Sequence, residues 1–178
     1  MEESKIRKVS WSEIISLTQK SARQIKEQYE NIDTIISLAR GGLWGSAIIS
    51  HILNVKRVYS FGINFYSSGN KIRKVPNIYQ ALPENFWSSN ILIVDDIIDS
   101  GRSIKHVLKY IEKKYYSDNK PIVYCAYFKL NKCGNLGTPT FYGECLDSDE
   151  WLVFPWETTH EANYFRTDDV NGSDLISV

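Results

Sequence analysis

The sequence predicts an α/β fold in which helices flank a mainly parallel β-sheet. Short apolar runs rich in β-branched residues alternate with segments whose apolar residues recur at helical spacing. Strands that alternate with helices are joined by right-handed crossovers, which leave the strands parallel. Three of the expected strands also end in conspicuous polar residues, at Arg40, at Asp95-Asp96 and at Lys129. Ligands bind beyond the carboxyl ends of such strands, so this convergence predicts a binding site there.

Length and composition indicate one soluble domain of 178 residues, with a core at about 9–157 and a C-terminal tail at 158–178 whose role the sequence does not indicate. Lys and Arg number 21, as do Asp and Glu, and this zero net charge argues against a nucleic-acid partner. No apolar run approaches the roughly 20 residues that a membrane helix requires. The N-terminus has no apolar signal core, and the three cysteines form no C-x-x-C pair. We therefore expect a cytoplasmic protein with reduced thiols and no membrane contact.

The first expected element is a helix that begins after Ser10. Ser10 and Glu13 have the spacing of a capping box, and Val9 and Ile14 that of a hydrophobic staple. Five strands and two further helices are then expected, and the fifth strand lies in the last third of the chain. The strands are expected at 34–39, 58–66, 91–94, 122–128 and 141–146, the helices at about 43–53 and 103–115, and a long mobile loop at 67–83.

Residues 91–103, ILIVDDIIDSGRS, form the most informative segment. An apolar strand is expected to carry two carboxylates at its end, and a short loop with Asp99 and Gly101 then opens a helix. Backbone amides and the helix dipole suit a phosphate there, Gly101 permits close approach, and Ser100 and Ser103 add hydroxyl donors. Carboxylates beside a phosphate predict a sugar, whose hydroxyls donate to them, and Mg²⁺, which prefers oxygen ligands.

This segment resembles, at all thirteen positions, the phosphoribosyl pyrophosphate signature of type I phosphoribosyltransferases. The resemblance implies the fold of that family, with a small hood built from the terminal segments. It also implies that Asp95 and Asp96 hold the ribose hydroxyls, directly or through Mg²⁺, and that Asp99 is the general base near purine N7. The 5-phosphate would rest on the loop, whose residues are Asp99, Ser100, Gly101, Arg102 and Ser103.

A receiver domain and a solvated turn both fit this segment less well. In the receiver domains of response regulators an acidic pair lies near the domain start, with a further aspartate about forty residues later. Here the pair is in the middle of the chain, and residues 128–137 contain no aspartate. A solvated turn is disfavoured because the three acids are packed between apolar residues.

The segment Ala39-Arg40-Gly41-Gly42 matches the pyrophosphate loop of the same family. Arg40 would supply positive charge, Gly41 and Gly42 would let backbone amides face the diphosphate, and the resemblance implies a cis peptide between Ala39 and Arg40. The loop at 67–83 corresponds to the mobile lid of the family. Its candidates for closing over diphosphate are Tyr66, Lys71, Arg73 and Lys74, and the alternative is an ordinary solvated loop.

The last third of the chain is similar to the short bacterial 6-oxopurine enzymes. By that resemblance Lys129 would donate to the 6-oxo group, Trp151 would stack on the ring, and the Leu152 backbone would contact the exocyclic edge. A cation does favour a carbonyl over an amino group, and an aromatic plane suits a purine. Alternatively, Lys129 is a surface lysine at a strand end and Trp151 is a core aromatic.

The resemblance implies Mg²⁺-dependent transfer of the 5-phosphoribosyl group from phosphoribosyl pyrophosphate to hypoxanthine, guanine or xanthine in purine salvage, by a homo-oligomer (a dimer or tetramer). The products would be a purine nucleoside monophosphate and diphosphate. Two alternatives stay open: another nucleobase as substrate, or a phosphoribosyl pyrophosphate-sensing regulator of the same fold. The absence of net positive charge favours the enzyme.

Overall fold

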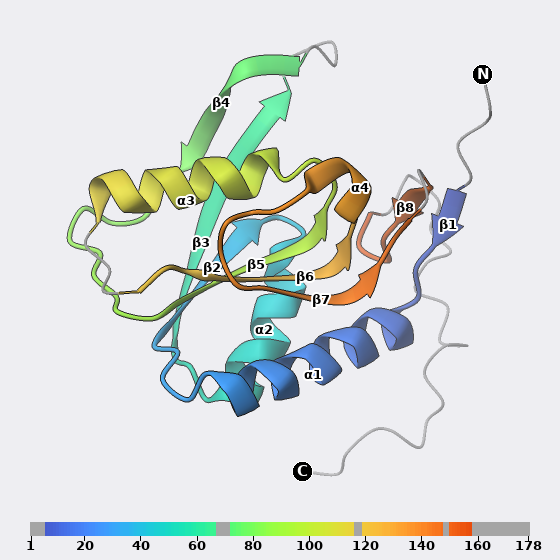
Figure 1. Cartoon of the computed structure of the whole chain (residues 1–178), viewed down its shortest axis with the longest axis horizontal. Helices are drawn as coiled ribbons and strands as arrows, with labels where there is room; N and C mark the ends of the chain where they lie inside the picture. Colours follow the sequence, from blue (N-terminus) through green and yellow to red (C-terminus); the bar gives the residue numbers. More distant parts are fainter. Residues whose placement is uncertain (1–5, 67–71, 116–118, 148–149, 158–178) are drawn as a thin grey trace.

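A six-stranded sheet forms the centre of the computed structural model, which describes residues 6–66, 72–115, 119–147 and 150–157 (Figure 1). Its strand order is β4-β3-β2-β5-β6-β7, and every neighbouring pair is parallel except β3 and β4. The predicted α/β fold with a mainly parallel sheet is thereby confirmed. The strands are β2 (Thr34–Ala39), β3 (Arg57–Tyr66), β4 (Ile72–Gln80), β5 (Ile91–Ile98), β6 (Ile122–Phe128) and β7 (Thr140–Cys145).

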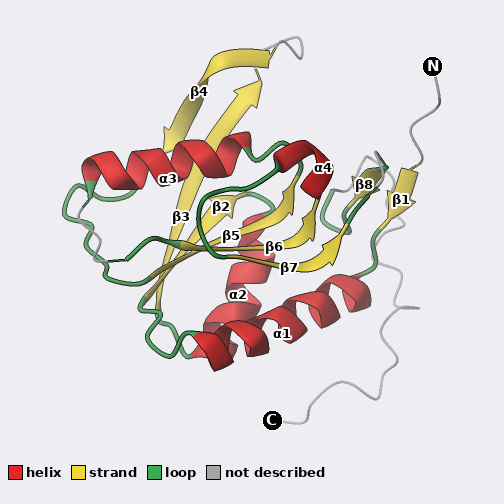
Figure 2. Cartoon of the chain, viewed as in Figure 1, coloured by secondary structure: helices red, strands yellow, loops and turns green. Residues whose placement is uncertain are grey.

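Helices cover both faces of this sheet (Figure 2). The helices α1 (Trp11–Gln28) and α2 (Gly42–Leu53) lie on one face, and α3 (Arg102–Lys114) lies on the other. Successive residues of β5 alternate between the two sides: Leu92 and Val94 pack in the cluster with α1 and α2, and Ile91 and Ile93 in the cluster with α3. Because both faces are buried, the strand is almost continuously apolar, as the sequence shows.

The first helix begins where the capping pattern predicts. Ser10 is its N-cap, and the Ser10 hydroxyl accepts a hydrogen bond from the backbone N–H of Glu13 at 3.2 Å.

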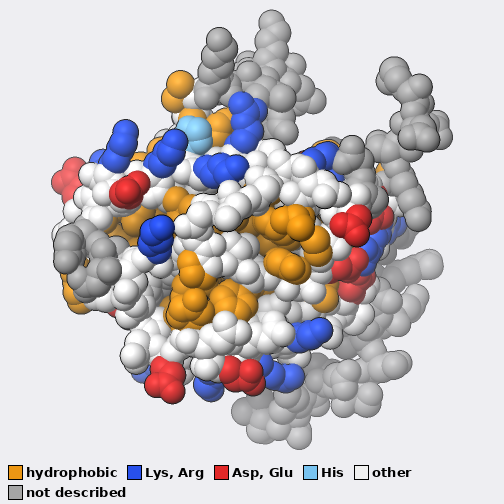
Figure 3. Space-filling model, in the orientation of Figure 1, with side chains coloured by type: hydrophobic (Ala, Val, Ile, Leu, Met, Phe, Trp, Pro, Cys, Tyr) orange, Lys and Arg blue, Asp and Glu red, His pale blue; other side chains and the backbone are white. Residues whose placement is uncertain are grey.

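The outer side of α3 is strongly basic, and Figure 3 shows Lys and Arg side chains along that edge of the molecule. None of the described helices combines the length and the apolar character needed to cross a membrane.

The expected hood is present as a small two-stranded sheet beyond the carboxyl ends of β6 and β7 (Figure 1). Its strands, β1 (Ile6–Lys8) and β8 (Trp151–Val153), come from opposite ends of the chain and run parallel, with Ile6 opposite Trp151. A short helix, α4 (Leu130–Cys133), follows β6.

Two sequence predictions are corrected. The third strand does not end at Val94 but continues to Ile98, so Asp95 and Asp96 lie within β5, where Asp95 is still paired with Cys125 of β6. The loop expected at 67–83 contains β4, which pairs antiparallel with β3. Pro76 favoured a loop in the sequence prediction. β4 is an edge strand, and an edge strand tolerates a proline because one side of it has no partner strand.

Candidate functional site

A cavity of about 360 Å³ lies at the carboxyl end of β5, where the chain turns into α3. Its lining comprises Phe65, Asp95, Ile97, Ile98 and residues 99–104. Gly101 is the N-cap of α3 and has a φ of 68°, a conformation that favours glycine. Residues 101–104 line the cavity, so the N-terminal backbone amides of α3 that have no partner within the helix are at hand for a ligand there.

Gly101 also has no room for a side chain. A Cβ atom there would lie 2.4 Å from the Cys133 sulfur, which belongs to α4. Beside it, the Arg102 guanidinium lies over the Phe65 ring, 5.3 Å from its centroid. The loop is thus packed between α4 on one side and the end of β3 on the other.

The two adjacent carboxylates lie between this cavity and the Arg-Gly-Gly segment. Asp95 lines the cavity, and the Asp96 carboxylate contacts Gly41, where a Cβ atom would be 1.8 Å from Asp96 Oδ2. Asp95 Oδ1 accepts the N–H of Asp96 at 3.0 Å, and Asp96 Oδ1 accepts the N–H of Ile97 at 2.7 Å. Burial raises the pKa of both carboxyls, to about 6 for Asp96, and the neighbouring Asp96 charge raises that of Asp95 further.

This donor set suits Mg²⁺. Two crowded, desolvated carboxylates are an unfavourable arrangement that a divalent cation would neutralise. Among the described residues no group of three or more acidic, His or Cys side chains could hold a metal by itself. Mg²⁺ commonly binds through one or two carboxylates together with substrate oxygens, so Asp95 and Asp96 match that mode.

The raised pKa of Asp96 predicts how the melting temperature of the metal-free protein depends on pH. A carboxyl with a folded pKa of about 6 and an unfolded pKa near 3.8 binds its proton more tightly in the folded state. Its contribution to stability is present below pH 3.8 and is lost as the pH rises through about 6. In excess chelator, Asp96→Asn should therefore melt at a higher temperature than the unchanged protein at pH 7.5, and this difference should shrink at pH 4.5. A melting difference that is independent of pH would contradict the assignment.

The Arg-Gly-Gly segment follows β2 and contains the expected cis peptide between Ala39 and Arg40. Arg40 is exposed, whereas Gly42 packs against β5 so closely that a Cβ atom would lie 2.2 Å from the Val94 carbonyl oxygen. The glycines are thus required by contact with β5 and Asp96, a reason that the sequence did not reveal. The Tyr79 hydroxyl of β4 donates to the Ala39 carbonyl at 3.0 Å and ties the β3–β4 hairpin to this segment.

Lys129 is not a surface residue: only 5% of it is exposed. Its backbone N–H donates to the Ile98 carbonyl at 2.9 Å, which fixes it beside the end of β5. Its ammonium donates to the Glu150 carbonyl at 2.9 Å and lies 4.0 Å from Asp99 Oδ1. Lys132 lies 3.5 Å from the same Asp99 oxygen. A buried lysine thus joins the loop that begins at Asp99 to the segment that precedes β8.

The other two expected base contacts lie on β8. Trp151 is 64% exposed, which excludes the alternative that it is a core aromatic, and Leu152 is buried. Trp151 directly follows Glu150, whose carbonyl accepts from Lys129, so all three predicted base-contacting residues are near one another in the fold.

The lid candidates are only partly described. Lys71 lies outside the described residues, and Tyr66, Arg73 and Lys74 belong to β3 and β4 without described side chains. The sequence reasoning missed Phe65, Tyr79 and Glu150. Their contacts join segments that are distant in the chain, and no local pattern indicated them.

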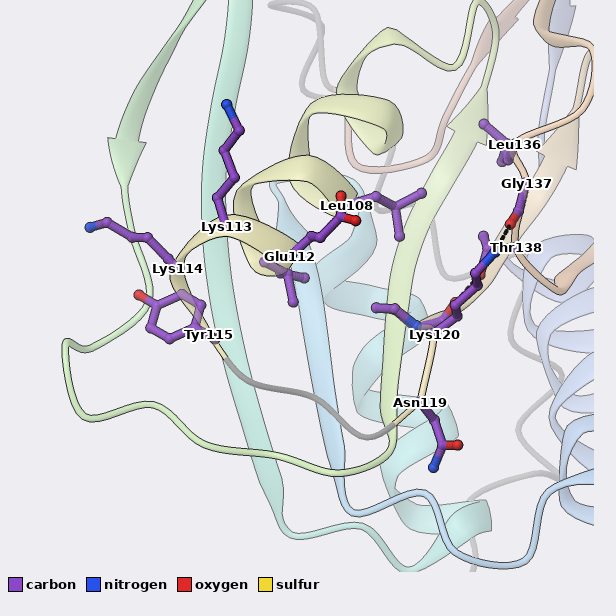
Figure 4. Close-up of a pocket in the computed structure, with 12 residues that line it drawn as sticks. Leu108, Glu112, Lys113, Lys114, Tyr115, Asn119, Lys120, Leu136, Gly137 and Thr138 are labelled. Atoms are coloured by element: carbon purple, nitrogen blue, oxygen red, sulfur yellow. Dashed lines mark hydrogen bonds between the residues drawn. The ribbon is translucent and has the colours of Figure 1, made fainter.

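A larger cavity of about 700 Å³ lies at the opposite end of the sheet, between the end of α3 and the segments that precede β6 and β7 (Figure 4). Its lysines do not converge. Lys113 and Lys114 point away from it, and Lys120 donates to the Gly137 carbonyl at 3.4 Å. The site at the end of β5, where acids, a buried lysine and helix amides converge, is chemically the better candidate.

The chain is similar in sequence and in fold to known proteins. The family model described as the phosphoribosyl transferase domain matches residues 10–163. The chain is 28% identical to a xanthine-guanine phosphoribosyltransferase of Idiomarina loihiensis over 84% of this chain and 85% of that protein. Among solved structures it is similar to a purine phosphoribosyltransferase from Pyrococcus horikoshii, with a TM-score of 0.69, 25% identity and coverage of 86% and 95%. A hypothetical protein from Neisseria gonorrhoeae with bound ppGpp has a TM-score of 0.75 at 20% identity, with coverage of 90% and 93%.

Proposed function

Because the chain belongs to the phosphoribosyl transferase family, we propose that it transfers the 5-phosphoribosyl group of phosphoribosyl pyrophosphate to a 6-oxopurine, in purine salvage. The observation that carries the choice of base is the buried Lys129, held between Asp99 and the Glu150 carbonyl next to the exposed Trp151. The xanthine-guanine and purine enzymes among the similar proteins support the same choice.

The sugar phosphate would be bound by the loop and by the acid pair. The 5-phosphate would accept hydrogen bonds from the backbone amides of residues 99–103 and the hydroxyls of Ser100 and Ser103, with Arg102 adding positive charge. Asp95 and Asp96 would accept from the ribose hydroxyls and hold Mg²⁺. When bound, Mg²⁺ would neutralise charge on the departing diphosphate. Arg40 and the amides of Gly41 and Gly42 would contact the same group, and Lys71 and Arg73 are proposed to approach it from the lid.

The base would enter between β5 and β8. The Lys129 ammonium would donate to the 6-oxo oxygen, the Trp151 ring would stack on the purine, and the Leu152 backbone would meet the exocyclic edge. In the reaction the bond from C1 of the ribose to the diphosphate oxygen breaks, and a bond from C1 to a purine ring nitrogen forms. Asp99 would accept the proton that the purine loses, while the nearby acids stabilise the positive charge that develops on the sugar.

The direct test is to incubate the protein with Mg²⁺, phosphoribosyl pyrophosphate and each of a panel of nucleobases, and to identify the nucleotides formed by mass spectrometry. We expect a nucleoside monophosphate with hypoxanthine, guanine or xanthine, little with adenine or pyrimidines, and none in excess chelator. Full activity in chelator would contradict the proposed role of Asp95 and Asp96. Preference for adenine would contradict the role of Lys129.

A second candidate function is ligand sensing without turnover. The hypothetical protein from Neisseria gonorrhoeae, which is similar in fold, carries ppGpp, a purine nucleotide with several phosphates. The same cavity, with its helix amides and its neighbouring base site, suits such a ligand. Tight binding of ppGpp or phosphoribosyl pyrophosphate by calorimetry, with no nucleotide formed from any base, would favour this role over the enzyme.

A further inference from the structure

Arg7 lies at the centre of a charged cluster that no part of the proposed chemistry uses. From β1, its guanidinium donates to both carboxylate oxygens of Glu144 on β7, at 2.7 and 2.9 Å, and to Glu13 on α1. Glu150 Oε1 lies 3.8 Å away, and the Tyr127 ring of β6 lies beneath the guanidinium, 5.5 Å from it. The Tyr127 hydroxyl also donates to Glu13 at 2.9 Å. One arginine thus joins five segments of the chain.

The cluster connects the hood to the main sheet. In the described residues β1 and β8 pair only with each other, so their backbone hydrogen bonds do not attach either strand to β7. Leu152 packs in the apolar cluster that contains Tyr127, and Arg7 adds a charged attachment to Glu144 and to Glu150, in the segment before β8. The carbonyl of the same Glu150 accepts from Lys129.

We propose that Arg7 is a positioning residue for base recognition. It holds residues 150–152 so that Lys129 and Trp151 face the purine together. This inference rests on the proposed function and adds a specific prediction to it: the cluster controls affinity for the base and leaves the sugar-phosphate site, which lies on β5 and α3, unchanged.

The charges explain why the arginine is needed. Glu13, Glu144 and Glu150 are three partly buried carboxylates around one cation. Without Arg7 they repel one another, and the favourable response is for the Glu150 segment to move away from the sheet. A lysine would keep the charge, but it cannot donate to both Glu144 oxygens and to Glu13 in the planar geometry of a guanidinium.

The test compares Arg7→Ala and Arg7→Lys with the unchanged protein and with Arg23→Ala, which removes an exposed arginine from α1 as a control. For Arg7→Ala we expect the KM for the purine to rise about tenfold or more. A tenfold change corresponds to roughly 1.4 kcal/mol, and the loss of a hydrogen bond to a charged group can cost that much. The KM for phosphoribosyl pyrophosphate should stay within about twofold, and Arg7→Lys should recover part of the loss. Equal increases in both KM values would overturn the proposal.

Glu144→Gln provides a second variant if Arg7→Ala folds poorly. It should show the same selective rise, and adding it to Arg7→Lys should cause less than the summed loss, because both changes weaken one interaction. A fully additive loss would count against the cluster.

A readout independent of activity separates this inference from the proposed function. Arg7→Ala should speed hydrogen exchange at Trp151–Val153 while leaving residues 99–104 unchanged. If the unchanged protein forms no nucleotide, the proposed function fails, and this exchange pattern still decides whether Arg7 positions the hood. Unaltered exchange at Trp151–Val153 would show that it does not.

Discussion

Replacing Asp99 with asparagine is expected to lower kcat by about 10²–10⁴-fold, or roughly 3–5 kcal/mol of barrier, because a general base typically contributes that much. The fold and phosphate binding should survive. The Asp99–Lys132 ion pair is exposed on both sides and contributes little to stability, and an asparagine at position 99 keeps an oxygen that can accept from the buried Lys129 ammonium. The measurements are kcat at saturating substrates, the affinity for phosphoribosyl pyrophosphate, and the melting temperature.

The structure excludes helix capping as a role for Asp99 and adds an ion pair with Lys132. Asp99 does not cap α3, because the N-cap is Gly101 and no side chain bonds there. It does pair with Lys132, so Lys132→Met is the matched control that weakens the ion pair and keeps the carboxylate. We expect that control to retain kcat within a few-fold. If Asp99→Asn turned over at a nearly normal rate, the carboxylate would be structural.

Replacing Lys129 with methionine should lower kcat/KM for 6-oxopurines by about 10²-fold, since a hydrogen bond from a charged donor contributes roughly 1.5–3 kcal/mol. Methionine keeps most of the side-chain volume and removes the ammonium. Affinity for phosphoribosyl pyrophosphate should change little, and discrimination against adenine should fall because the donor that selects a carbonyl is gone.

The Lys129 ammonium also donates to the Glu150 carbonyl, so the melting temperature must be measured to separate lost recognition from a disordered hood. Equal losses of affinity for the base and for phosphoribosyl pyrophosphate would mean that Lys129 is structural or contacts the sugar phosphate.

The elements predicted correctly are those with local causes. The capping box at Ser10 and the apolar run of β6 follow from neighbouring residues, and the observed bounds of β6 match the expected ones. The acid pair and the turn at Gly101 were also visible, because their residues are contiguous. The end of β5 was predicted too early because adjacent acidic residues such as Asp95 and Asp96 are typical of loops. Pairing with β6 keeps this segment in the strand.

The elements that were missed depend on partners elsewhere in the chain. β4 forms because β3 offers it an edge, and its Tyr79 packs over Gly62 and reaches the Ala39 carbonyl. The strands β1 and β8 have three residues each, too few for any periodic pattern, and form because they pair with each other.

The sequence by itself determined the alternating fold, the acid pair and the glycine turn that we propose binds phosphate, since each is encoded in a short continuous segment. Only the tertiary structure decided which groups meet. Lys129 and Glu150 are 21 residues apart, and Arg7 and Glu144 are 137 apart. Local propensity carries no information about such pairs, because burial and charge pairing arise only when packing brings distant segments together. The attachment of the hood, and with it the arrangement of the proposed base site, is therefore a property of the folded chain.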